Sequence, residues 1–138
     1  FNKNFNTKYF KKYTQNRNKN IKSLLMDQTF IAGLGNIYVN EALFMSKIKP
    51  LRRCSSLNKK EIKKLILNIK KILKFSISKG GASIRDFQNT LGKSGNFQQF
   101  FCVYGQENKK CSRISCGGKI KKITIANRSS FYCEKCQI

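Results

Sequence analysis

The sequence predicts a mostly α-helical fold with a small β-hairpin towards its C-terminal end. Two observations lead to this prediction. Apolar residues recur at helical spacing between residues 21 and 79, and two close pairs of cysteines enclose a β-prone run after residue 106. A length of 138 residues suits one domain, or two small ones that share a modest core. We therefore divide the chain into residues 1–20, 21–105 and 106–138.

Residues 1–20 are polar and basic and show no periodicity. We expect a linker from a preceding domain here, with a short helix around Phe5–Tyr13. The first residue is Phe1 rather than Met, so the chain is interpreted as a fragment of a longer protein. Its function would then be one part of the parent protein's function.

Residues 21–50 carry two short helical patterns on either side of a turn that contains Gly33 and Gly35. Asn36 follows this turn, where we expect the N-cap of the second helix. A helix N-terminus behind a glycine turn presents unpaired N–H groups and the positive end of the helix dipole, which favours phosphate binding. An ordinary helix–turn–helix packing element is the alternative, and local chemistry alone favours it slightly.

Residues 55–79 form the clearest helical pattern. Asn58 and Glu61 make a capping arrangement near its start, and Gly80–Gly81 ends it. Its apolar side chains fall on one stripe that we expect to lie in the core, while most of its lysines occupy the other faces. Beyond it we expect a long glycine-bearing loop and then an extended run, Phe97–Tyr104.

Four of the six cysteines form two close pairs. Four residues separate Cys111 from Cys116, and two separate Cys133 from Cys136. Two such pairs are typical of a tetrahedral zinc site with four thiolate ligands, which has no open position and is therefore structural. Disulfides are the alternative, but no secretion signal is visible and the other two cysteines are isolated. We predict one structural Zn²⁺ ion and a hairpin that needs it to fold.

The hairpin between the cysteine pairs offers a candidate functional residue. We expect its turn at residues 126–129, with Arg128 at the tip. A guanidinium on a stiff loop suits contact with a phosphate or with the edge of a base. An exposed turn arginine without any role is an equally good interpretation from local sequence.

Charge favours one class of partner. Lys and Arg number 29 and Asp and Glu number 6, which gives a net charge of +23. The abundance of Lys, Asn, Ile and Phe is typical of an AT-rich genome, so codon bias accounts for part of this charge. A chain this basic still binds polyanions, which favours nucleic acid. There is no run of about 18 apolar residues that would predict a membrane span, and the absence of histidine excludes His-based acid–base chemistry in this stretch.

Four sequence blocks occur in the same order as in one enzyme family. The chain resembles the C-terminal half of the formamidopyrimidine-DNA glycosylases, which are bacterial-type repair enzymes for oxidised purines. The resemblance implies a helix–two-turn–helix DNA-binding domain with a lesion loop over residues 21–105, followed by a four-cysteine zinc-ribbon finger. The matching blocks are residues 21–44 (IKSLLMDQ, GLGNIY and EALF), 80–87 (GGASIRDF), 92–105 (GKSGNF and VYG) and 128–137 (RSSFYCEKCQ).

The resemblance also implies roles for individual residues. Asn36 would contact the phosphate beside the lesion, with Lys22 and Lys19 as further DNA-binding candidates. Arg128 would bind the phosphates that flank the flipped nucleotide and would take part in δ-elimination, which makes it the catalytic candidate. Tyr104 would support contacts to the DNA backbone.

The central chemistry of the family is absent from this chain. The family's nucleophile is an N-terminal proline amine that attacks the sugar and forms a Schiff base. The one proline here, Pro50, is internal, so its nitrogen is an amide. We expect the parent chain to be a glycosylase and AP lyase that acts on damaged double-stranded DNA. The fragment alone would bind zinc and DNA without cleaving, and the loop of residues 82–96 would close over the everted base.

Two features depart from the family pattern. The first cysteine pair encloses four residues rather than two, so Ser112–Ser115 must form a wider knuckle. Asn18 stands where the family has a basic residue, with Arg17 and Lys19 beside it. The alternatives are the sister endonuclease that removes oxidised pyrimidines, a non-enzymatic zinc-ribbon module that binds nucleic acid, and a decayed gene. We expect a monomer in a reducing compartment, the cytoplasm of a bacterium or an organelle.

Overall fold

The computed structural model describes residues 6–15, 18–27, 29–31, 34–78 and 101–138. Within these residues two strands pair antiparallel, which together with the helices confirms the predicted mostly α fold with a C-terminal hairpin. Among the described helices, none combines the length and the apolar character that crossing a bilayer requires. The elements are α1 (Thr7–Thr14), α2 (Ile21–Leu25), α3 (Asn36–Met45), the 3-10 helix η1 (Cys54–Ser56), α4 (Lys59–Ser78), β1 (Ile120–Ile125) and β2 (Arg128–Cys133).

Local capping explains where the helices start. At the start of α4, the Asn58 side chain accepts from the Glu61 N–H (2.8 Å) and the Glu61 carboxylate accepts from the Asn58 N–H (3.0 Å). This is the predicted reciprocal cap, but it starts the helix at Lys59, so the predicted start at residue 55 is wrong. Asn20 caps α2 by accepting from the Ser23 N–H at 2.8 Å.

The predicted N-cap of α3 is also wrong. Gly35 is the cap residue, without a side-chain hydrogen bond, and Asn36 is the first residue of the helix. The Asn36 amide instead donates to the carbonyl oxygen of Ser129 in the hairpin, at 3.0 Å. A partner 93 residues away therefore replaces the local cap. The helix predicted around Phe5–Tyr13 is α1, although Phe5 lies outside the described residues.

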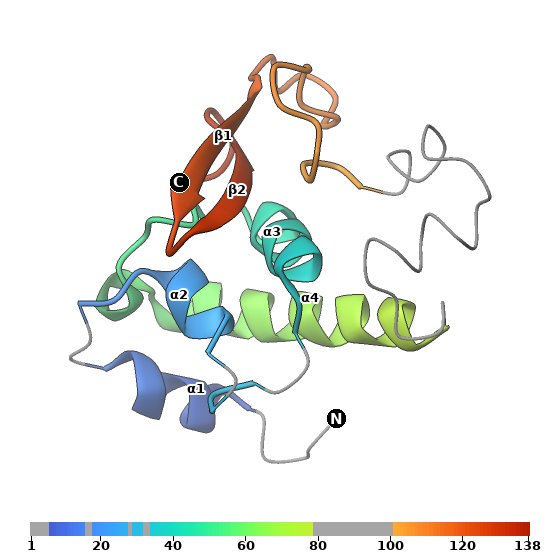
Figure 1. The fold of residues 1–138 in the computed structure, drawn as a ribbon. Helices are drawn as coiled ribbons and strands as arrows, with labels where there is room; N and C mark the ends of the chain where they lie inside the picture. Colours follow the sequence, from blue (N-terminus) through green and yellow to red (C-terminus); the bar gives the residue numbers. More distant parts are fainter. Residues whose placement is uncertain (1–5, 16–17, 28, 32–33, 79–100) are drawn as a thin grey trace.

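Helix α4 is the base on which α1 and α3 pack. Helices α1 and α3 both contact it, and in Figure 1 α1 lies below α4 while α3 and the hairpin lie above. The predicted apolar stripe faces this core, whereas the neighbouring Lys63 and Lys64 are exposed. The stripe residues that are no more than 6% exposed are Ile62, Leu65, Ile66 and Ile69.

A second, smaller apolar cluster joins the helices to the finger. Phe44 of α3 and Val103, which precedes the finger, belong to it. Since α3 also contacts β2, the finger shares its core with the helical part. The finger residues in this cluster are Cys111, Ile120, Phe131 and Cys133.

The segment before the finger differs from the prediction. Residues 101–104 form a bend and a turn rather than an extended run. The buried Glu41 carboxylate accepts hydrogen bonds from the N–H groups of residues 102, 103 and 104, which curls this segment around one side chain. Residues 97–100, Gly33, Gly80–Gly81, Arg17 and the loop of residues 82–96 lie outside the described residues.

The hairpin turn is tighter than predicted. Ala126 and Asn127 alone form it, with φ values of 51° and 64°, as a two-residue turn of a twisted hairpin requires. Arg128 is not a turn residue but the first residue of β2, paired with Ile125 of β1. It is exposed and lies directly beside the tip.

Candidate metal centre and nucleic-acid interface

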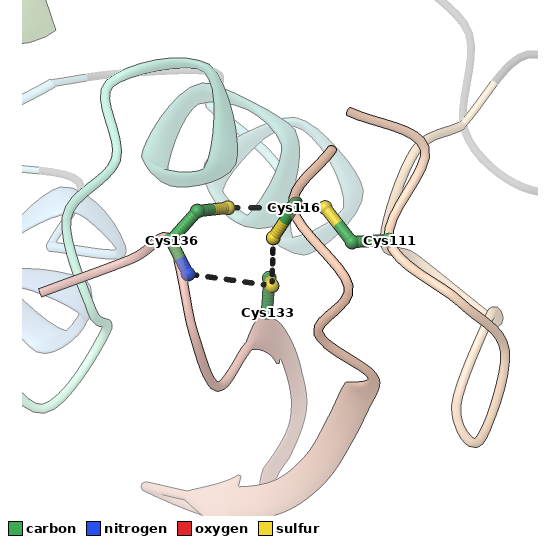
Figure 2. A group of neighbouring side chains, drawn as sticks. All are labelled: Cys111, Cys116, Cys133 and Cys136. Carbon is green, nitrogen blue, oxygen red and sulfur yellow. Dashed lines mark hydrogen bonds between the residues drawn. The ribbon is translucent and has the colours of Figure 1, made fainter. Parts of the chain in front are cut away.

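The four paired cysteines meet at one point of the finger. Figure 2 shows their sulfur atoms pointing toward one another from the loop before β1 and from the end of β2. All four Sγ atoms lie within 4.8 Å of one another; Cys111 and Cys136 are 3.8 Å apart and Cys116 and Cys133 are 3.6 Å apart. Four thiolates at a Zn–S length of about 2.3 Å lie roughly 3.8 Å apart in a tetrahedron. The cluster therefore fits one zinc ion.

The protein around the sulfurs favours the thiolate of Cys133 but not that of Cys111. Burial alone would raise the pKa of Cys133, but the backbone N–H groups of Cys136 and Lys135 lower it to about 7. Burial raises the pKa of Cys111 to about 12, and a bound metal ion is what ionises such a thiol. Gly118 gives the chain the space to pass the cluster, because a Cβ atom there would lie 2.8 Å from the Cys133 sulfur.

Arg113 braces the wide knuckle against the end of α3. Its guanidinium donates to the Cys136 sulfur at 2.9 Å and to the carbonyl oxygen of Phe44. It also lies over the Phe44 ring, 3.9 Å from the centroid. Arg113 of the knuckle therefore brings a cation to the negative end of the α3 dipole. Sequence reasoning noted the wider knuckle but gave Arg113 no role.

A second cluster of polar contacts lies at the opposite end of the hairpin. The Lys22 ammonium donates to the Ser129 carbonyl oxygen (3.0 Å) and to the Ser130 hydroxyl. The Asn36 amide donates to the same Ser129 oxygen. Three DNA-binding candidates, Lys22, Asn36 and Arg128, therefore meet at the start of β2, although they come from α2, α3 and the hairpin.

The electrostatics of this cluster suit an anion. Burial and, to a smaller extent, the positive charge of Arg128 together lower the pKa of Lys22 to about 8. Two cations close together, with neutral oxygens as the ammonium's hydrogen-bond partners, form a site that negative charge would stabilise.

Comparison with known proteins decides the family. Residues 1–88 match the family model described as the formamidopyrimidine-DNA glycosylase H2TH domain. The chain belongs to this family. Residues 108–138 match the zinc finger found in FPG and IleRS, which confirms the prediction of one structural zinc ion.

Members of the formamidopyrimidine-DNA glycosylase family match almost the whole chain. The formamidopyrimidine-DNA glycosylase of Oceanobacillus iheyensis is 45% identical over 137 residues, which are 99% of this chain and 48% of that protein. A crystal structure of the Lactococcus lactis enzyme with DNA containing an abasic site has a TM-score of 0.81 at 40% identity, covering 97% of this chain and 48% of that one. Its complex with DNA containing FAPY-dG gives 0.80 at 41% identity, covering 96% and 47%. The chain spans about half the length of the relatives it matches.

Of the two remaining DNA-binding candidates, Tyr104 contacts the cluster, whereas the contacts of Lys19 lie elsewhere. Tyr104 is half-buried and packs edge-on against Phe131, with 4.9 Å between ring centroids. Burial raises the pKa of Tyr104, and a hydrogen bond with the Asn36 side chain partly offsets the rise. Lys19 is exposed and pairs with Asp27 at 3.6 Å. It lies on the segment that enters α2, and the Cys54 N–H donates to its carbonyl oxygen.

Sequence reasoning missed two residues of α3 that hold this region together. Asn40 accepts from the Phe131 N–H at 2.8 Å and donates to the Asn36 carbonyl oxygen at 2.8 Å. Its neighbour Glu41 holds the segment that carries Tyr104. An Asn–Glu pair inside an otherwise apolar helix was the available signal, because buried polar side chains need partners.

Proposed function

We propose that this chain is the C-terminal DNA-binding part of a bifunctional glycosylase and AP lyase. The whole protein would remove oxidised purines, formamidopyrimidine and 8-oxoguanine, from duplex DNA in base-excision repair. The observation that carries the proposal is the meeting of α2, α3 and the hairpin at the Ser129 carbonyl, beside the exposed Arg128. This places the exposed cation Arg128 next to the N-terminal end of α3, on the elements that match the family's DNA-binding domain and finger.

Each candidate residue would contact a different part of the DNA backbone, according to its position in the fold. Asn36 lies at the N-terminal end of α3, where the helix dipole and the first N–H groups attract a phosphate. Arg128 projects from the rigid start of β2, so its guanidinium can bind two phosphate oxygens at once. We infer that Arg128 is also the residue that assists δ-elimination. Tyr104 and Lys19 would extend the same surface along the DNA backbone.

The metal centre would support this surface from the other end of the hairpin. We propose Cys111, Cys116, Cys133 and Cys136 as the ligands of the zinc ion. With four thiolates the ion supplies folding free energy and no chemistry to the reaction. Cys133 ends β2 and Arg128 begins it, so the metal would fix one end of the strand that carries the arginine.

The attack on the glycosidic bond would come from a part of the protein outside this sequence. The nitrogen of Pro50 is an internal amide and cannot serve as the family's nucleophile. We propose that the chain alone binds zinc and damaged duplex DNA without releasing a base. It would work as a monomer in the cytoplasm of a bacterium or an organelle, with the helical domain ending near residue 105 and the finger beginning near residue 106.

A binding measurement tests this function. The zinc-loaded chain is titrated at low salt into a fluorescent duplex that carries a tetrahydrofuran abasic-site analogue, and anisotropy is recorded. Arg128→Ala should weaken binding by about 1–3 kcal/mol, which is roughly 5- to 150-fold. Lys121→Ala is the matched control, because it removes one positive charge from the same hairpin at an exposed, surface-paired site. Equal losses in both variants, or base release by the chain alone, would contradict the proposal.

A further inference from the structure

Lys22 differs from every other DNA-binding candidate of this chain in its burial. Its side chain is 1% exposed, whereas Arg128 and Lys19 are exposed and Asn36 is half-buried. Its ammonium group already donates to two oxygens of the hairpin, the Ser129 carbonyl and the Ser130 hydroxyl. Those partners are 107 and 108 residues away in sequence. The contact therefore forms only when the helical part and the finger pack against each other.

This burial argues against a direct role in binding phosphate. A phosphate oxygen is similar in size to a water molecule, and a side chain that water does not reach offers no surface to that oxygen. Charge alone is also a poor guide, because Lys22 is one of 29 basic residues in the chain. The geometry therefore separates Lys22 from the residues that face the DNA.

The contacts of Lys22 instead fix the residue next to Arg128. The Ser129 carbonyl oxygen receives one hydrogen bond from Lys22 and one from Asn36. Ser130, which is fully buried, is held by the same ammonium group. Arg128 therefore lies between a tight two-residue turn and Ser129, whose carbonyl oxygen is hydrogen-bonded to side chains of both α2 and α3.

We propose that Lys22, through Ser129 and Ser130, is a positioning residue that holds Arg128 beside the N-terminal end of α3, so that both can bind the DNA backbone together. This inference rests on the proposed function and assigns Lys22 to the protein framework rather than to the DNA contacts. A lysine suits the task because its three N–H donors can serve two acceptors on adjacent residues. The Ser130 hydroxyl is the second acceptor for the Lys22 ammonium group, and it faces Lys22 only in this register of the hairpin.

Salt dependence distinguishes the two roles. Each phosphate contact that is lost lowers the slope of log affinity against log salt by about 0.9. Anisotropy titrations with the tetrahydrofuran duplex at several salt concentrations give this slope for the zinc-loaded chain. Arg128→Ala should lower the slope by about one. Lys22→Met should weaken binding about tenfold, within the coupling range of contacting residues. The slope should stay unchanged, because Arg128 keeps its charge beside the phosphate and loses only the alignment of its hydrogen bonds.

A double-mutant cycle measures the dependence on Arg128. If Lys22 acts by positioning Arg128, then Lys22→Met should have little further effect in the Arg128→Ala background. Ser130→Ala is a milder probe, because it keeps the lysine charge and removes one of its acceptors. It should also weaken binding about threefold at unchanged slope. Lys63→Met, a change at an exposed lysine of α4, controls for the loss of one charge and should leave the affinity close to that of the wild type.

The possible outcomes are separable. A wild-type chain that does not bind the duplex at low salt refutes the proposed function itself. If the wild type binds, then a slope lowered by about one in Lys22→Met, or additive effects in the cycle, overturns the positioning role. Zinc content and melting temperature show whether Lys22→Met is folded. Should it unfold, Ser130→Ala decides: weaker binding at unchanged slope supports the proposal, and unchanged or tighter binding overturns it.

Discussion

Glu41 offers the sharpest test of how the finger is joined to the helices. Its carboxylate is 5% exposed and accepts from the N–H groups of Cys102, Val103 and Tyr104 at 2.7, 3.0 and 2.9 Å. One carboxylate oxygen takes the Cys102 bond and the other takes the remaining two. Burial raises the pKa of Glu41, and the three hydrogen bonds only partly offset the rise. Burying the Glu41 charge therefore costs free energy, and the three hydrogen bonds that the carboxylate accepts offset part of this cost.

Glu41→Gln should destabilise the chain by about 2 kcal/mol. A glutamine oxygen can retain two of the three bonds, but its NH₂ group then faces the remaining N–H. Losing one bond to a charged group costs roughly 1.5–3 kcal/mol, and the other two weaken as the charge is lost. Removing a buried charge returns part of this cost. Glu41→Ala leaves all three donors without a partner and should cost about 3–5 kcal/mol.

Urea unfolding followed by circular dichroism at a fixed zinc concentration gives these free energies. Glu107→Gln is the matched control, since Glu107 makes a surface ion pair with Lys122 at 3.6 Å and its loss should cost at most about 0.5 kcal/mol. If Glu41→Gln were as stable as Glu107→Gln, the segment of residues 102–104 would not depend on this carboxylate, and the reasoning would be refuted.

Three other measurements follow from the same contacts. Gly118→Ala should lower stability by roughly 1–3 kcal/mol and weaken zinc binding, because the new Cβ would lie 2.8 Å from the Cys133 sulfur. Gly35→Ala, where nothing lies within 4 Å of the new Cβ, is the control and should keep its zinc affinity. Competition with a chelator measures both affinities, and a lower zinc affinity in Gly35→Ala than in Gly118→Ala would contradict this. Cys133→Ser, or removal of zinc by a chelator, should unfold the finger while the helical circular dichroism signal largely remains. The pKa of Lys22 falls from 10.5 to about 8 on folding, so the unfolded chain binds more protons than the folded one between these pH values. The wild type should therefore gain stability relative to Lys22→Met as the pH rises from 8 to 10.5. A difference in melting temperature between the two proteins that stays the same at pH 7.5, 9 and 10 would contradict this.

Features with local causes could be predicted from the sequence. The spacing of the four cysteines indicated the metal centre, because both pairs form from short segments whose geometry the spacing limits. The cap between Asn58 and Glu61 and the apolar stripe of α4 likewise depend on residues three or four positions apart. These features are present in the structure as expected, although the helix start moved to the cap itself.

Features with distant causes could not be predicted. Asn36 has the chemistry of an N-cap, but the Ser129 carbonyl, 93 residues away, takes its amide. Lys22 is a lysine among many in the sequence, and only the fold reveals that it is buried against Ser130. The hairpin turn was placed two residues too long, because Arg128 and Ser129 are polar enough for a turn while the ladder continues through them. For Asn36 and Lys22 a tertiary partner outweighed a sound local preference, and for the turn the hydrogen-bond ladder of the hairpin did so.

The shared cluster around Phe44 and Val103 has a consequence for protein engineering. The finger shares part of its apolar interior with α3, and Arg113 joins it to the C-terminal end of that helix. Transplanting residues 106–138 into another scaffold would strip those neighbours away and leave apolar surface open to solvent. A successful graft would have to carry the matching face of α3 with it.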